Sequence, residues 1–321
     1  MGENYKNCKM KKVLLIGSNG YIGTLLYKKF NKIYNITCID DCWFNPPPNN
    51  VDIIKKDFNS LEKDFIQEYD VIILLAGHSS VKMCEGEFSN AFNNNVTNFI
   101  NLLQKLNKKQ KFIYASSSSV YGSVGGKTVS EKYYGFKPYN QYDISKHTID
   151  LYAEKSDIEY YGLRFGTVCG YSPIMRNDVM INAMTCSALE NGEIKLYIKN
   201  IMRPVLGIDD LCRAMKSIIE CEEDKRGLYN LASFNKTAEQ IAYEVSEVTK
   251  IPVVEYKSDP TQIDNQKSQT KCYNFSISTK KFKKEFNFQF NESVESITKS
   301  IIDNYSKINL TTRNKIHNYV S

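Results

Sequence analysis

Near its N-terminus the chain reads Lys12-Val-Leu-Leu-Ile-Gly17-Ser-Asn-Gly20-Tyr-Ile-Gly23, an apolar run followed by three spaced glycines. The run is short and ends in glycine, so it predicts a buried strand. The residues from 21 to 30 have helical spacing. A strand, a glycine turn and a helix in this order predict a dinucleotide site, because the helix N-terminus offers free N–H groups and a positive dipole to a pyrophosphate.

Each glycine of this turn has a distinct expected role. Gly17 allows the tight turn, Gly20 lets the backbone approach the pyrophosphate, and Gly23 lets the helix pack against the strand. The alternative is a glycine-rich turn without a ligand, which the order of elements disfavours. We expect cofactor contacts from Gly17, Asn19, Gly20, Tyr21, Ile22 and Gly23.

Acidic residues follow the next two predicted strands. Asp40 ends the second strand, where a carboxylate accepts hydrogen bonds from the adenosine ribose and repels a 2′-phosphate. Asp41 follows it in place of an arginine, so the sequence favours NAD over NADP. Asp57, beside Phe58, follows the third strand and either bonds the adenine amino group or caps a helix near Ser60. Asp40, Asp41, Asp57 and Phe58 are therefore predicted cofactor residues.

The first half of the chain alternates short apolar runs with helical patterns. Strands that are apolar throughout indicate a parallel sheet covered on both faces. We therefore predict an α/β fold of the doubly wound Rossmann type. The predicted strands are 12–16, 35–39, 51–54, 71–75, 111–115 and 159–165, and the predicted helices are 21–30, 91–106 and 142–154.

The pattern changes after Gly170. We expect residues 1–170 to form an NAD-binding domain and residues 171–321 to form a smaller α+β substrate lobe, part of which could return to the sheet. This half has predicted helices at 181–189, 209–220, 238–249 and 294–305 and a strand at 193–198. The doublets Lys280-Lys281 and Lys283-Lys284 predict a solvated helix face.

Composition excludes several classes of protein. The 321 residues contain 42 Lys and Arg against 36 Asp and Glu, and a net charge of +6 gives little support for nucleic-acid binding. No segment is long and apolar enough to predict a membrane span. The nine cysteines form no framework and no zinc pattern, which indicates reduced thiols in a cytoplasmic protein. His78, His147 and His317 match no metal spacing, so no metal is expected.

A serine run, a tyrosine and a lysine follow the glycine turn in order. The fifth predicted strand ends in Ser116-Ser-Ser-Ser119, and Tyr142 and Lys146 lie one turn apart on a predicted helix. A free tyrosine has a pKa near ~10 and is a poor base. A nearby ammonium and a positive nicotinamide ring should lower that pKa. The phenolate could then accept a sugar hydroxyl proton while hydride leaves the same carbon. The alternative is an ordinary amphipathic helix.

Together these motifs resemble the extended short-chain dehydrogenases/reductases, in the NAD-dependent epimerase/dehydratase group that acts on nucleotide sugars. The resemblance covers nearly the whole chain. It implies that Tyr142 is the general base and acid, that Lys146 holds the nicotinamide ribose, and that Ser117 is the third catalytic residue. It rests on the glycine turn, Leu75-Ala-Gly77, Asn95, Ser117 with Val120-Tyr-Gly122, Tyr142 with Lys146, Leu163-Arg-Phe165, Arg203-Pro-Val-Leu-Gly-Ile-Asp-Asp210 and Gly227-Leu-Tyr-Asn-Leu231.

The resemblance also implies further contacts. Cofactor contacts are expected from Leu75, Ala76, Gly77, Asn95 and Phe165, and substrate contacts from Ser117, Ser118, Ser119, Thr167, Asn182 and Arg203. Arginine suits a diphosphate because its planar fork makes two charge-assisted bonds. For Arg203 the alternative is an ion pair with Asp209 or Asp210. Lys271 is a weaker diphosphate candidate, and Trp43 could shield the adenine.

Members of the family often dimerise through the helix that carries the catalytic tyrosine and the helix before it. We therefore expect a homodimer. The side chains at Phe92, Phe99, Tyr139 and Tyr152 are compatible with such an interface and equally with an intramolecular core.

Departures from the family pattern narrow the expected reaction. In the 4,6-dehydratases, Asp-Glu follows the residue at position 117, whereas this chain has Ser118 and Ser119. Thr167 stands where many members have asparagine. Tyr171-Ser-Pro-Ile-Met-Arg176 resembles a subgroup with a Ser-Pro-Arg-Met-Arg sequence that acts on unusual nucleotide sugars. The sequence predicts a nucleotide-sugar 4-epimerase with a transient 4-keto sugar. The alternatives are a C4 oxidase or reductase with net redox change and a non-catalytic dinucleotide-binding sensor.

Overall fold

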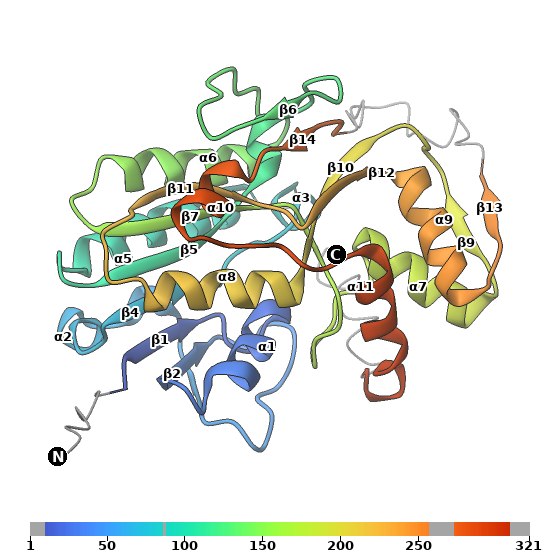
Figure 1. Cartoon of the computed structure of the whole chain (residues 1–321). Helices are drawn as coiled ribbons and strands as arrows, with labels where there is room; N and C mark the ends of the chain where they lie inside the picture. Colours follow the sequence, from blue (N-terminus) through green and yellow to red (C-terminus); the bar gives the residue numbers. More distant parts are fainter. Residues whose placement is uncertain (1–9, 86–87, 257–272, 309–321) are drawn as a thin grey trace, which may run out of the picture.

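The computed structural model describes residues 10–85, 88–256 and 273–308. Its centre is a seven-stranded, wholly parallel sheet with the order β11-β7-β5-β4-β1-β2-β3 (Figure 1). The strands are β1 (Lys12–Ile16), β2 (Asn35–Asp40), β3 (Ile53–Lys55), β4 (Val71–Leu74), β5 (Lys111–Ser117), β7 (Glu159–Phe165) and β11 (Gly227–Leu231). This sheet confirms the predicted Rossmann-type α/β fold.

Burial on both faces explains why the run from Val13 to Ile16 in the central strand β1 contains no polar residue. Successive side chains of a strand point to opposite faces of the sheet. Val13 and Leu15 therefore pack in the core under α1 (Tyr21–Phe30) and α8 (Ile208–Glu220). Leu14 and Ile16 pack on the other face, under α5 (Asn98–Lys105) and α6 (Gln141–Glu154). Both faces are covered, so the four buried positions from Val13 to Ile16 are all apolar.

The strand order reverses beside β1, which pairs with β2 on one side and with β4 on the other. In doubly wound sheets such a reversal opens a crevice at the carboxyl ends of the strands, where ligands bind. The glycine turn follows β1, and the serine run ends β5. The topology therefore directs the predicted site residues to one edge of the sheet.

A second group of elements lies beside this edge, on the right of Figure 1. Helices α7 (Met180–Asn191), α9 (Ala238–Thr249) and α11 (Val294–Ile302) share a hydrophobic core of their own. They accompany a small sheet of β8 (Thr167–Cys169), β10 (Met202–Gly207) and β12 (Phe234–Thr237), and the pair β9 (Ile194–Leu196) and β13 (Val253–Glu255). Two later elements, α8 and β11, belong instead to the layers of the main sheet.

Some sequence predictions differ from the structure. The third strand begins at Ile53 instead of 51, because the Val51 N–H donates to the Pro48 carbonyl (3.2 Å) in a turn. The helix predicted at 91–106 is instead α4 (Phe88–Phe92), a π-helical turn (Asn93–Thr97) and α5. The strands β8, β10 and β12 were not predicted. Their one, four and no buried positions, respectively, do not alternate along the strand and so give no clear period.

The lysine doublets lie on α10 (Lys280–Glu285), next to the short pair β6 (Thr128–Val129) and β14 (Ser276–Ile277). A solvated position is wrong for Lys281, whose Nζ lies 4.1 Å from the Tyr229 ring centroid and donates to the Leu228 carbonyl (2.9 Å). Lys280, Lys283 and Lys284 are exposed, as predicted.

Within the described ranges, none of the helices has both the length and the apolar character needed to cross a membrane.

Candidate active site

A cleft of ≈ 430 Å³ lies at the carboxyl edge of the sheet, between the main sheet and the second group of helices. Every predicted cofactor and substrate residue lines it except Asn95 and Asn182. The cleft therefore brings together the glycine turn after β1, the acidic residues after β2 and β3, the serine run of β5 and the face of α6 that carries Tyr142.

The glycine turn is packed so closely that Gly17 and Gly23 could not carry side chains. Gly17 has a φ of +89°, and a Cβ there would stand 2.5 Å from the Ala76 nitrogen. A Cβ on Gly23 would stand 2.1 Å from the Gly17 carbonyl oxygen. No side chain caps the N-terminus of α1 at Gly20. The end of this helix can therefore receive the pyrophosphate of a dinucleotide.

The carboxylate of Asp40 is held in a fixed orientation at the end of β2. Its Oδ2 accepts from the Asn19 N–H (2.8 Å) and its Oδ1 from the Cys42 N–H (2.7 Å). Burial raises the pKa of Asp40, and these two hydrogen bonds oppose the rise. Each oxygen retains acceptor capacity. The arrangement fits the hydroxyls of an adenosine ribose.

The end of the cleft where the sequence predicts the adenine has both acidic and aromatic side chains. Asp57 lines the cleft and also caps the short 3₁₀ turn Phe58–Ser60, where the Asn59 N–H donates to its Oδ1 (2.9 Å). Trp43 lines the cleft as well, and its Nε1 donates to Asp41 Oδ2 (2.7 Å). The His78 ring contacts the Trp43 ring, and their centroids lie 5.2 Å apart.

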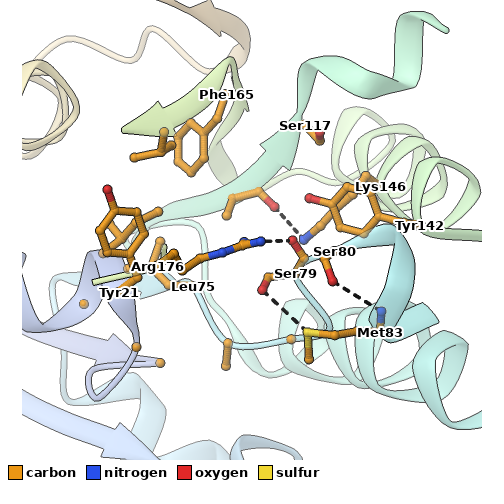
Figure 2. A pocket seen from close by; sticks show the side chains of 18 of the residues that line it. Tyr21, Leu75, Ser79, Ser80, Met83, Ser117, Tyr142, Lys146, Phe165 and Arg176 are labelled. Carbon is orange, nitrogen blue, oxygen red and sulfur yellow. Dashed lines mark hydrogen bonds between the residues drawn. The ribbon is translucent and has the colours of Figure 1, made fainter. Parts of the chain in front are cut away.

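The three predicted catalytic side chains converge on the cleft (Figure 2). Tyr142 and Lys146 come from one face of α6, as their spacing predicted, and Ser117 ends β5. The Lys146 Nζ donates to the Ala115 carbonyl (2.9 Å) and lies 5.8 Å from the Tyr142 ring centroid. Ser117 Oγ lies 2.8 Å from Ser119 Oγ.

Burial is the largest influence on the pKa values of Tyr142 and Lys146. Desolvation in the cleft raises the pKa of Tyr142 to about 12, and the hydrogen bond from Ser117 and the charge of Arg176 act to lower it. Burial lowers the pKa of Lys146 to about 8, and the Asp150 carboxylate opposes this change. The Arg176 charge therefore favours the Tyr142 phenolate.

Arg176 is a cleft residue that the sequence reasoning did not assign to the site. It extends across the cleft toward Tyr142 and Lys146, and its Nη1 donates to the Ser79 carbonyl at 3.5 Å (Figure 2). Asp178 holds the guanidinium through two bonds, at 2.9 and 2.7 Å. The Ser-Pro-Ile-Met-Arg sequence was the available signal for this residue.

Asn95 and Asn182 lie behind the cleft wall and hold its backbone. Asn95 Oδ1 accepts from the His78 N–H (2.8 Å), and its Nδ2 donates to the His78 carbonyl (3.0 Å). Asn182 Oδ1 accepts from the Gly170 N–H (2.9 Å), and its Nδ2 donates to the Arg176 carbonyl (2.7 Å). Each asparagine thus fixes a segment that borders the cleft.

Arg203 lines the cleft from β10, and its guanidinium carbon lies 5.8 Å from the ring centroid of Tyr273, a second cleft residue. The alternative ion pair is not formed, because Asp209 pairs with Lys29 (2.8 Å) and Asp210 with Arg213. Lys271 lies outside the described residues. Arg203 therefore adds a second cleft cation from residues 171–321, after Arg176, and this one lies beside an aromatic ring.

Comparison with known proteins supports the family resemblance found in the sequence. The sequence profile of the NAD dependent epimerase/dehydratase family matches residues 13–232. Protein CapI of Staphylococcus aureus is 27% identical over 233 residues, which are 65% of this chain and 69% of CapI. UDP-glucose 4-epimerase of Lactobacillus helveticus is 28% identical over 174 residues, which are 50% of this chain and 53% of that enzyme.

A solved structure matches over a greater length. UDP-glucuronic acid 4-epimerase from Bacillus cereus, in complex with UDP-glucuronic acid and NAD, has a TM-score of 0.76 and 21% identity. The match covers 92% of this chain and 99% of that chain. At this identity the likeness is one of fold.

Proposed function

The chain belongs to the NAD dependent epimerase/dehydratase family, and we propose that it is a nucleotide-sugar 4-epimerase that acts through a transient 4-keto sugar. One observation carries the proposal. Tyr142, Lys146 and Ser117 meet in the same cleft as the glycine turn and the Asp40 carboxylate. A base thus stands in the compartment that fits a dinucleotide, as the oxidation of an alcohol by hydride transfer requires.

In this proposal each site residue has its own role. The N-terminus of α1 binds the pyrophosphate, Asp40 the adenosine ribose and Lys146 the nicotinamide ribose. Tyr142 accepts the proton of the C4 hydroxyl, and Ser117 orients that hydroxyl. Bound NAD would supply the acceptor for the C4 hydride and its donor in the return step. Tyr142 then gives the proton back after the keto sugar has presented its other face.

The composition of the cleft supports epimerisation over elimination of water. Ser118 and Ser119 line the cleft where an acid and a base would be needed for elimination, and a serine hydroxyl is neutral at pH 7. Arg203 faces the same space and is proposed to bind the diphosphate of the sugar nucleotide.

The proposal predicts the products of the reaction. Purified protein incubated with NAD and a panel of UDP-, GDP-, dTDP- and ADP-sugars should convert at least one sugar nucleotide into its C4 epimer. No NADH should accumulate, because the hydride returns to the sugar. NMR of the products identifies the C4 epimer, and absorbance at the NADH band measures any NADH that accumulates. Stoichiometric NADH with a keto product would show a C4 oxidase instead.

We also propose a homodimer that forms through α6. Of the four aromatic residues considered from sequence, Phe99 is 1% exposed in the core, whereas Tyr152 is 49% exposed. Leu151 lies beside it and is 47% exposed. Sedimentation should show a dimer that Leu151→Lys converts to a monomer, because the charge would be buried in the interface. Leu189→Lys on α7 is the matched control and should stay dimeric. A monomeric unmodified protein would contradict the proposal.

A further inference from the structure

A buried ion pair lies directly behind the serine run. Asp150 of α6 and Arg164 of β7 are both fully buried, and the Arg164 Nε donates to Asp150 Oδ2 at 2.8 Å. Neither side chain lines the cleft. Well-packed apolar side chains of similar volume often give at least as much stability as a buried ion pair, so stability alone explains such a pair poorly. We therefore examine which segments this pair holds together.

Asp150 joins α6 to the end of β5. Lys146 and Asp150 are four residues apart, so they lie on one face of the helix in successive turns. The Lys146 Nζ donates to the Ala115 carbonyl (2.9 Å). One turn later, the Asp150 carboxylate accepts from the hydroxyls of Ser116 (3.0 Å) and Tyr114 (3.1 Å). Two successive turns of the helix are thus bonded to consecutive residues at the end of the strand.

Arg164 holds the same strand end from the neighbouring strand. In the parallel register of β5 and β7, Arg164 is the partner of Ser116. Its Nη1 donates to the Tyr121 hydroxyl at 3.0 Å. Tyr121 belongs to the 3₁₀ turn Ser118–Tyr121, which directly follows Ser117. The ion pair is therefore bonded to the segments on both sides of Ser117 as well as to α6.

We propose that Asp150 is a positioning residue for the reaction. Together with Arg164 it fixes the cleft face of α6 against the end of β5. Lys146 is thereby held where it can reach the nicotinamide ribose, and Tyr142 is held at a fixed distance from Ser117. This inference rests on the roles that these residues have in the proposed function. Asp150 itself contacts neither cofactor nor sugar and acts only through the groups that it holds.

A carboxylate suits this position because its partners all donate. The Arg164 guanidinium and the hydroxyls of Ser116 and Tyr114 give three hydrogen bonds to its two oxygens. Asparagine would turn an N–H₂ group, which only donates, toward one of these donors. Glutamate would keep both acceptor oxygens on a stem that is one methylene longer. Asp150→Asn should therefore loosen α6 from the strand, whereas Asp150→Glu should largely keep the connection.

The test compares two ligands that reach different parts of the cleft. In the proposed arrangement ADP contacts only α1 and Asp40, whereas NAD also contacts Lys146. Asp150→Asn should weaken NAD binding about tenfold or more, the usual loss for one hydrogen bond from a charged group, and leave ADP binding unchanged. Asp150→Glu should recover most of the NAD affinity. Isothermal titration calorimetry measures both ligands at a temperature where near-UV circular dichroism shows each variant to be folded. Equal losses for NAD and ADP, or an unchanged NAD affinity, would each overturn the proposal.

A second variant keeps the test decisive if Asp150→Asn does not fold. Tyr114→Phe removes one hydrogen bond to Asp150, keeps the ion pair and lies outside the cleft wall. It should weaken NAD binding relative to ADP binding about threefold. Tyr34→Phe is the matched control, because the buried Tyr34 hydroxyl donates to Glu220 (3.0 Å) on the other face of the sheet. Its NAD-to-ADP affinity ratio should equal that of the unmodified protein.

The same ratio in Tyr114→Phe as in Tyr34→Phe would contradict the proposal. These titrations use no sugar, so a failed substrate panel would reject the epimerase proposal without deciding the role of Asp150.

Discussion

Replacing Tyr142 with phenylalanine should slow C4 epimerisation by about 10²–10⁴-fold, the usual contribution of a positioned acid–base group. The change removes one hydroxyl from the cleft and leaves the ring in place. The glycine turn and Asp40 are untouched, so NAD affinity should stay the same. Single-turnover kinetics measure the first effect. Fluorescence of Trp43, the one tryptophan of the chain and a residue of the cleft wall, can report NAD binding.

A matched control lies on the same helix. Tyr152 is 49% exposed and does not line the cleft, so Tyr152→Phe should leave the rate unchanged. If Tyr142→Phe kept the full rate, proton transfer would depend on another group. A chain that binds NAD but converts no sugar in either form would instead favour a dinucleotide-binding sensor.

The second large effect is expected in stability. Asp150 and Arg164 form a buried ion pair beneath the serine run, with Nε to Oδ2 at 2.8 Å and side chains 1% and 2% exposed. The Ser116 hydroxyl (3.0 Å) and the Tyr114 hydroxyl (3.1 Å) also donate to this carboxylate. Asp150→Asn leaves the guanidinium buried without a counter-charge. The free energy of unfolding should fall by about 3–5 kcal/mol.

Urea unfolding at neutral pH measures this change, and an exposed pair supplies the control. Lys108 and Asp157 form an ion pair at 2.7 Å with side chains 73% and 77% exposed. Asp157→Asn makes the same chemical change in water, and it should leave the free energy of unfolding nearly unchanged. Similar losses in the two variants would mean that burial does not decide the strength of the Asp150–Arg164 pair.

Local patterns carried most of what the sequence predicted correctly. The strand at 12–16, the helix at 21–30, the strand at 159–165 and the helix at 238–249 have the predicted bounds. Tyr142 and Lys146 share a face because a helix repeats every 3.6 residues, which requires no tertiary information. The glycine turn was equally local, since its residues are contiguous.

The remaining site features depend on tertiary contacts. Arg176 and Tyr273 reach the cleft from segments far from Tyr142 in the chain. The raised pKa of Tyr142 results from desolvation by the walls of the cleft, which spacing along one helix cannot predict. Asn95 was assigned to the cofactor from the family resemblance and Asn182 to the substrate as a polar residue of the second half, yet their amides hydrogen-bond to backbone groups. Phe99 was ambiguous because apolar positions occur in cores and interfaces alike.

The central claim is that hydride leaves C4 and returns to it without exchange with solvent. The most direct test is to run the sugar-nucleotide panel with NAD in D₂O and to examine the product by mass spectrometry and ¹H NMR. We predict a C4 epimer of unchanged mass and no accumulated NADH. Conversion of no sugar, deuterium incorporated into the product, loss of water or net NADH would each contradict it.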